Sequence, residues 1–194
     1  MKVLVTGFEP FGGDAINPSW EAVKLLPDRI GSADIIGLQV PVEYGRAGRV
    51  VLDAAWRLQP ELIVCTGLAS GRQQVTPELL AVNWRMAKAP DNAGRSYSGV
   101  RIDPNGPAAR MTTLPAVQLT ERVQAEELPC SLSLSAGAYV CNDLYWSVLT
   151  RQEEDGGCPA LFVHVPSMEY MPSRMCADAL SIIIDGALAG LGGK

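Results

Sequence analysis

Short apolar runs alternate with stretches of helical pattern along almost the whole chain of 194 residues. Five runs rich in Val, Ile and Leu are typical of buried strands, and they cover residues 3–5, 35–40, 62–65, 79–82 and 161–165. Apolar residues recur with helical spacing over residues 19–26, 47–58, 115–127, 142–152 and 173–188. Strands that alternate with helices predict an α/β fold, and a chain of this length fits one domain.

One long segment, residues 88–106, breaks this alternation. It is rich in Gly, Pro, Asp, Asn and Ser, which disfavour regular helices and strands. We therefore expect a long, functional loop here rather than a linker between domains. The chain shows no internal repeat.

The charge balance argues against nucleic acid and membranes as partners. The formal net charge is -5, and no cluster of Lys and Arg is dense enough to form a basic patch. The first apolar run is too short for the apolar region of a signal peptide. Residues 177–191 are interrupted by Asp178 and Asp185 and fall short of the roughly 20 residues that span a bilayer. We expect a cytoplasmic protein.

The cysteines argue against a metal site. There are five, an odd number, and none forms a C-x-x-C pair: Cys65, Cys130, Cys141, Cys158 and Cys176. With a single histidine in the chain, no spaced set of zinc ligands can be assembled. We expect mostly reduced thiols and neither a metal nor an organic cofactor.

His164 is the only histidine, so any step that needs an imidazole near neutral pH must use it. It lies near the end of the apolar run 161–165, which Pro166 terminates. Catalytic groups gather at the carboxyl ends of strands in α/β sheets, which makes His164 a candidate general base. A core histidine bonded to a backbone carbonyl is the alternative that the residue alone leaves open.

Cys141 has the surroundings that best suit a nucleophile. The turn-forming run Ser135-Ala136-Gly137 precedes a helical pattern that starts near Cys141, so we expect the sulfur close to a helix amino terminus. The partial positive charge there favours the thiolate, and a nearby imidazolium adds to the same shift. The alternative is a buried structural cysteine.

A Cys-His pair usually needs a third group that holds the imidazole, commonly a carboxylate or an amide. Glu78 follows the turn-rich segment 67–77 and directly precedes the apolar run 79–82, so it is a candidate. A solvated Glu78, free or paired with Arg72, is the alternative.

The loop 7–13, Gly-Phe-Glu-Pro-Phe-Gly-Gly, follows the first apolar run and so falls at the same edge of the sheet. Its two Phe rings are suited to lining an apolar pocket, although they can equally cap the core. The loop lacks the Lys-Ser/Thr of a P-loop and does not match G-x-G-x-x-G. The segment 67–71, Gly-Leu-Ala-Ser-Gly, departs from the G-x-S-x-G motif of serine hydrolases.

Four blocks in order, spread over nearly the whole chain, resemble the type I pyroglutamyl peptidases, which remove an amino-terminal pyroglutamate from peptides. They are residues 5–13 with 17–21, 71–83, 136–142 and 162–166. The resemblance implies that residues 1–194 form a single cysteine peptidase domain with a twisted central sheet flanked by helices on both faces. It also implies a homodimer or homotetramer, with peptides that carry an amino-terminal pyroglutamate as partners.

By the same resemblance, Cys141 is the nucleophile, His164 the base and Glu78 the residue that orients the imidazole, while Phe8 and Phe11 sandwich the lactam ring. The other substrate-binding residues that it implies are Asn17, Leu68, Lys88, Tyr139 and Val140. We expect a thiolate-imidazolium pair at rest, and an oxyanion held by backbone N–H groups around Cys141 and by Lys88.

Several positions depart from the family pattern, including residues 42–44, where Val-Glu-Tyr replaces Thr-Val-Phe and favours a pocket for a related but different ring. Leu68 replaces a usual Gln, which removes a polar contact, and Lys88 replaces an Arg, which removes a planar fork of donors. Asp143 replaces a His and places a carboxylate near the thiol, where it would raise the thiol pKa. Tyr139 replaces a Phe. These changes keep two alternatives open: a catalytically silent relative that binds a peptide end or a small lactam, and an amidase for a related ring.

Overall fold

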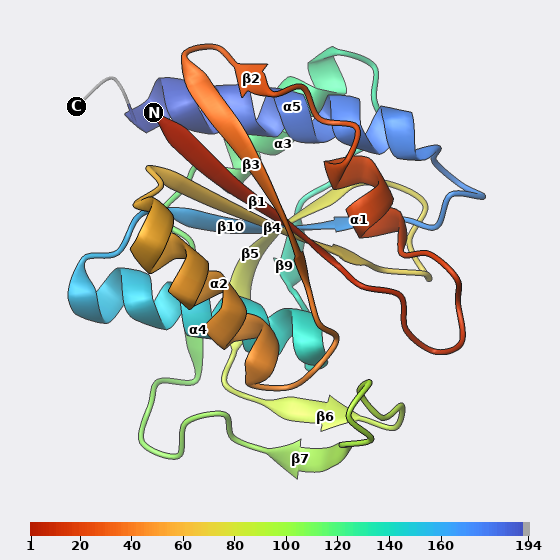
Figure 1. The fold of residues 1–194 in the computed structure, drawn as a ribbon, viewed down its shortest axis with the longest axis vertical. Coiled ribbons are helices and arrows are strands. Elements are labelled where there is room, and N and C mark those ends of the chain that lie inside the picture. Colours follow the sequence, from red (N-terminus) through yellow and green to blue (C-terminus); the bar gives the residue numbers. More distant parts are fainter. Residues whose placement is uncertain (192–194) are drawn as a thin grey trace.

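A mixed sheet runs through the middle of the computed structural model, which describes residues 1–191 without the side chain of Asp155 (Figure 1). The last three residues of the predicted domain 1–194 thus lie outside the described part. The strand order is β2-β3-β1-β4-β10-β5-β8, and β9 also pairs with β5. The strands are β1 (Lys2–Phe8), β2 (Arg29–Ile30), β3 (Ala33–Val40), β4 (Leu62–Leu68), β5 (Thr76–Val82), β8 (Ala109–Met111), β9 (Ser133–Ser135) and β10 (Ala160–Val165).

Helices cover both faces of this sheet, as Figure 1 shows. One face carries α1 (Pro18–Val23), α3 (Ala116–Ala125) and α5 (Ser173–Leu191), and the other carries α2 (Arg46–Leu58) and α4 (Val140–Asp155). The buried strands are apolar on both sides. In β1, Val3 and Val5 join the core between the sheet and α1, α3 and α5, whereas Leu4 joins the core between the sheet and α2 and α4. The predicted α/β fold, with one central sheet between two layers of helices, is confirmed.

The start of β5 differs from the prediction in a way that matters for the site. The apolar pattern places the strand after Glu78, but β5 begins at Thr76, and Glu78 pairs with Phe162 of β10 in antiparallel register. Pairing with β10 extends the strand through residues that are not apolar. Glu78 is therefore fully buried inside the sheet rather than ahead of it.

The prediction of a structureless loop over residues 88–106 is wrong in part. β7 (Tyr97–Val100) lies inside this segment and pairs with β6 (Arg85–Ala87) in a two-stranded ribbon. The ring of Tyr97 packs edge-on against that of Tyr44, with 4.8 Å between centroids, and this contact attaches the ribbon to the main body. Aromatic packing thus orders a segment whose composition disfavours strands.

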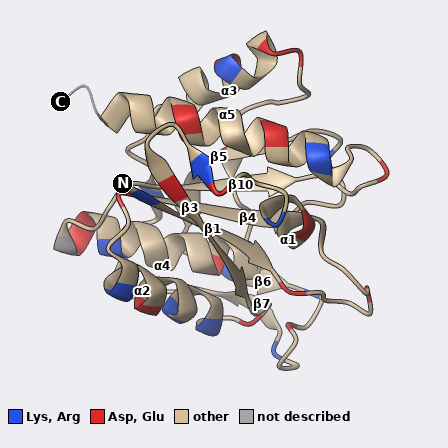
Figure 2. Cartoon of the chain, turned by 45° about the horizontal axis from the view of Figure 1, so that its top comes forward, with Lys and Arg blue, Asp and Glu red and all other residues tan. Residues whose placement is uncertain are grey.

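Charged side chains of both signs are scattered over the helices, and a red segment lies between blue ones along α2 in Figure 2. This pattern fits the absence of Lys and Arg clusters in the sequence. Among residues 1–191, no helix has the length and apolar character needed to cross a lipid bilayer.

Candidate active site

His164 and Glu78 form a buried pair on the face of the sheet that α4 covers. The Nδ1 atom of His164 lies 2.7 Å from Oε1 of Glu78, and both residues are buried. Arg72 donates from Nη1 to the same carboxylate oxygen at 2.5 Å. A carboxylate that accepts the Nδ1–H of a histidine leaves Nε2 as the proton acceptor, so Glu78 holds the imidazole in the form of a general base.

Cys141 reaches the same part of the sheet from the first turn of α4. Gly67 of β4 pairs directly with His164 of β10, and a Cβ added to Gly67 would lie 2.8 Å from Sγ of Cys141. The sulfur therefore lies over the backbone beside His164, in space that only a glycine leaves open. The predicted start of a helix near Cys141 is confirmed, since α4 begins at Val140.

This contact predicts that Gly67→Ala lowers the kcat of the peptidase reaction implied by the resemblance by about 100-fold. A loss of this size is typical of a misplaced reacting group. The new Cβ would lie 2.8 Å from the Cys141 sulfur and 2.9 Å from Cζ of Phe162, so the thiol must move. Steady-state kinetics of the purified variant would measure the effect. Gly190→Ala in α5 is the matched control, because nothing lies within 4 Å of its Cβ position. Equal kcat for both variants would contradict this placement of the thiol.

The resting charge state differs from the expected thiolate-imidazolium pair. Burial, with a smaller contribution from Glu78, raises the pKa of Cys141 to about 12. Burial also lowers the pKa of His164, and the hydrogen bond and charge of Glu78 only partly oppose this. Loss of hydration is the largest cause of both shifts, and both favour the neutral thiol and the neutral imidazole over the charged pair.

A neutral thiol predicts how alkylation of the free protein depends on pH. Below the thiol pKa the thiolate fraction grows about tenfold per pH unit, so the rate at which iodoacetamide labels Cys141 should rise about tenfold per unit between pH 7 and pH 9. Mass spectrometry of the labelled peptide would follow Cys141 separately from the other thiols. A rate independent of pH over this range would instead indicate a stable ion pair.

Asp143 does not act on the thiol as its sequence position suggests. Its carboxylate faces away, accepting a hydrogen bond from the Gly45 N–H and pairing with Nε of Arg85 at 2.5 Å. The raised pKa of Cys141 comes from burial first and Glu78 second. The pKa of Cys141 is raised as expected, but the prediction that Asp143 raises it is wrong.

A small, largely apolar pocket opens beside the Cys141 sulfur. It brings together six of the seven expected substrate-binding residues with Cys141, and adds Val42: the lining is Phe8, Phe11, Asn17, Val42, Leu68, Tyr139, Val140 and Cys141. Asn17 is the one residue here with a side-chain amide, and that amide is engaged within the protein. Its Nδ2 donates to the Glu9 carbonyl, and its Oδ1 accepts from Ser19.

The rim of this pocket is held by the Pro90-Asp91-Asn92 turn. Tyr139 donates from its hydroxyl to the Pro90 carbonyl at 2.8 Å, and Asp91 accepts from the Tyr44 N–H at 2.9 Å. Asn92 donates to Oε1 of Glu9 at 2.8 Å. The segment predicted as a functional loop therefore connects the two walls of the pocket.

Lys88 is the expected site residue that does not line the pocket. It is exposed and lies along a separate depression beside the ribbon, lined by Met86, Ala87, Lys88, Ser96, Tyr97 and Ser98. Sequence reasoning also left out Gly67 as a site residue, whereas Val42 belongs to the segment 42–44 that it connected with the pocket. Nothing in the sequence marks Gly67, because its role depends on which strand lies next to β4.

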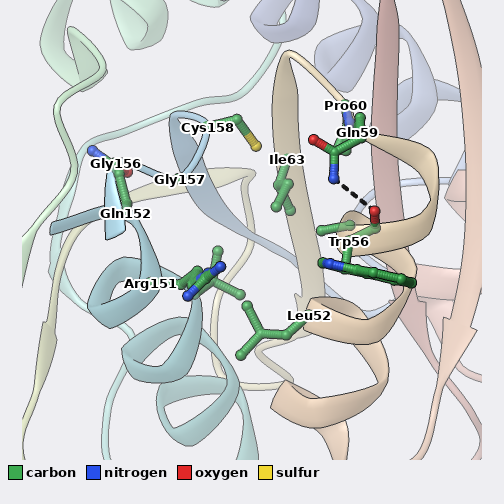
Figure 3. A pocket seen from close by; sticks show the side chains of 12 residues that line it. Leu52, Trp56, Gln59, Pro60, Ile63, Arg151, Gln152, Gly156, Gly157 and Cys158 are labelled. Carbon is green, nitrogen blue, oxygen red and sulfur yellow. Dashed lines mark hydrogen bonds between the residues drawn. The ribbon is translucent and has the colours of Figure 1, made fainter. Parts of the chain in front are cut away.

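A further cavity, of about 240 Å³, lies at the opposite ends of the strands (Figure 3). Trp56 and Leu52 of α2 form one side, and Cys158 lies above Ile63 near the start of β4. Burial raises the pKa of Cys158 to about 11. Because this cavity faces the amino ends of β4 and β10, it is separate from the site around Cys141.

A thiol at a helix start, an imidazole held by a buried carboxylate and an adjoining apolar pocket are the parts of a cysteine hydrolase on an α/β sheet. Comparison with known proteins agrees with this class of enzyme and identifies the family. The family model described as pyroglutamyl peptidase matches residues 1–192. The chain belongs to this family.

Individual relatives cover most of the chain. The pyrrolidone-carboxylate peptidase of Enterococcus faecalis is 42% identical over 90% of this chain and 81% of its own length. That of Bacillus velezensis is 40% identical over 93% of this chain and 85% of its own. Pyroglutamyl peptidase I of Bacillus amyloliquefaciens has a crystal structure with a TM-score of 0.90, at 37% identity and 97% coverage of both chains.

Proposed function

We propose that this chain is a cysteine peptidase that removes an amino-terminal pyroglutamyl residue from peptides. The observation that carries the proposal is the position of Cys141, which lines the aromatic pocket and whose sulfur lies over Gly67, the strand partner of His164. A compact neutral ring without a free amine fits an apolar slot of this kind. Phe8, Phe11 and Tyr139 would contact the ring.

The neutral resting state defines the order of proton transfers. As the sulfur attacks the pyroglutamyl carbonyl, Nε2 of His164 takes the thiol proton, and the Glu78 carboxylate stabilises the imidazolium. His164 then gives this proton to the leaving amine as the C–N bond breaks, which leaves a thioester on Cys141. Water, deprotonated by His164, cleaves the thioester and releases pyroglutamate. Backbone N–H groups at the start of α4 would hold the oxyanion.

Hydrolysis of a fluorogenic pyroglutamyl amide by the purified protein tests this proposal, with the matching prolyl amide as specificity control. We expect release from the pyroglutamyl amide alone, under reducing conditions. Binding of the pyroglutamyl amide without release would favour the catalytically silent alternative.

One observation supports a second candidate, an amidase for a related ring. Leu68 contributes an apolar side chain, and the one side-chain amide of the pocket, that of Asn17, is already hydrogen-bonded within the protein, so the lactam N–H and C=O would rely mainly on backbone partners. The carbocyclic analogue, a cyclopentanecarbonyl amide, belongs in the same substrate panel. If it is cleaved as fast as the pyroglutamyl amide, the ring alone is recognised and the second candidate is favoured.

The remaining expectations are part of the same proposal: one peptidase domain over residues 1–194, a cytoplasmic location and a homodimer or homotetramer. Size-exclusion chromatography with light scattering would measure the subunit number.

A further inference from the structure

A polar groove of about 670 Å³ lies next to the catalytic groups and takes no part in the mechanism above. Its lining is Arg72, Gln73, Gln74, Thr76, Pro129, Ser131, Leu132 and Ser133. One wall is the connection between β4 and β5, and the other is the segment that leads into β9.

Hydrogen bonds between the two walls fix the shape of this groove. The Val75 N–H donates to the Pro129 carbonyl, and the Ser131 N–H donates to the Val75 carbonyl, both at 3.1 Å. Nε2 of Gln74 also donates to Oγ of Ser131 at 2.6 Å. The groove is therefore formed in the free protein rather than created by a ligand.

Each wall of the groove is connected to a catalytic residue, one through hydrogen bonds and the other along the chain. Arg72 lines the groove while its Nη1 contacts the Glu78 oxygen that holds His164. The other wall continues from Ser133 through the short strand β9 to Cys141, which lies six residues after the end of that strand at Ser135. The groove thus adjoins the Glu78 side of the catalytic groups, whereas the aromatic pocket adjoins Cys141 and Leu68.

We propose that this groove binds the part of the substrate that follows the scissile bond, and that it favours acidic leaving peptides. The inference rests on the proposed peptidase function. With the first ring in the aromatic pocket and its carbonyl at Cys141, the rest of the peptide must pass His164, which protonates its amine. The groove is the polar surface that adjoins His164 through Arg72 and Glu78.

The charge of the lining gives the preference. Among the described residues that line the groove, Arg72 is the one charged residue, and its side chain is 32% exposed despite the contact with Glu78. The neutral Gln, Ser and Thr side chains can bond to peptide amides without selecting a sequence. A cation among neutral donors favours an acidic side chain or a free terminal carboxylate.

The preference for acidic leaving peptides can be tested by changing the charge of the groove and comparing kcat/KM for two substrates. The substrates are pyroglutamyl-Ala-Asp and pyroglutamyl-Ala-Lys, both with amidated carboxyl ends, and the readout is the ratio of their kcat/KM values at low salt. The wild type should prefer the Asp peptide. Gln73→Glu, at an exposed position of the groove, should lower the ratio about three- to tenfold and Gln73→Lys should raise it by a similar factor, as expected for one charge at short range in water.

Gln118→Glu in α3 is the matched control, because it makes the same change at an exposed position on the other face of the sheet. Its ratio should equal that of the wild type. Identical ratios for the wild type and both Gln73 variants, with the fluorogenic amide still cleaved, would overturn the groove as the peptide site. Failure of the wild type to cleave the fluorogenic amide would overturn the proposed function itself, and the inference with it.

Discussion

Replacement of Cys141 by alanine is expected to lower kcat for a pyroglutamyl amide by at least about 10⁴-fold, since the variant has no nucleophile to form the thioester. The loss should appear with the fold intact, because the substitution removes a single sulfur atom from a small side chain. Steady-state kinetics together with thermal unfolding would separate loss of chemistry from loss of structure.

Cys158→Ala is the control for this experiment. Cys158 is also partly buried and also has a raised pKa, but it lies in the cavity at the opposite ends of the strands (Figure 3). Its kcat should stay within about twofold of the wild type, as for most substitutions away from the reacting groups. A Cys141→Ala variant that retains activity would exclude this residue as the nucleophile.

Replacement of Glu78 by glutamine should lower kcat by about 10³-fold or more, the scale of losing the carboxylate that orients a catalytic imidazole. The amide keeps the shape but removes the charge that stabilises the imidazolium of His164. Because Glu78 raises the pKa of His164, its removal should also move the acid limb of the kcat/KM profile to lower pH. A purely structural role would leave the position of that limb unchanged.

Glu153→Gln offers the same chemical change in another Arg-Glu ion pair, away from the site. Glu153 pairs with Arg110, which keeps Glu154 as a second partner. Its kinetics should match the wild type. If Glu78→Gln keeps a wild-type kcat and pH profile, Glu78 does not orient the base.

Much of the fold follows from the sequence because the strands and helices carry strong periodic patterns. The apolar runs around Val5 and Val163 and the long pattern that ends the chain all form the expected elements. The ribbon is not predictable from local patterns because β7 pairs with β6 and its Tyr97 packs on Tyr44, a residue far away in the sequence. Local composition contains no information about such a contact.

Some residues of the site can likewise be predicted from the sequence, whereas others depend on the folded sheet. His164 and Cys141 are prominent in the sequence, one as the single histidine and the other through the turn before its helix. The role of Gly67 requires the register between β4 and β10, which only the folded sheet defines. The neutral resting pair was also out of reach, because the pKa of Cys141 and that of His164 depend on burial.

A pyroglutamyl chloromethyl ketone tests whether Cys141 attacks the carbonyl of a ring held in the aromatic pocket. Incubation with the reduced native protein, followed by peptide mapping, would identify the alkylated residue. We expect one label per chain, on Cys141, and we expect free pyroglutamate to slow the reaction. Labelling of Cys130 or Cys158 in place of Cys141, or no labelling of the folded protein, would contradict it.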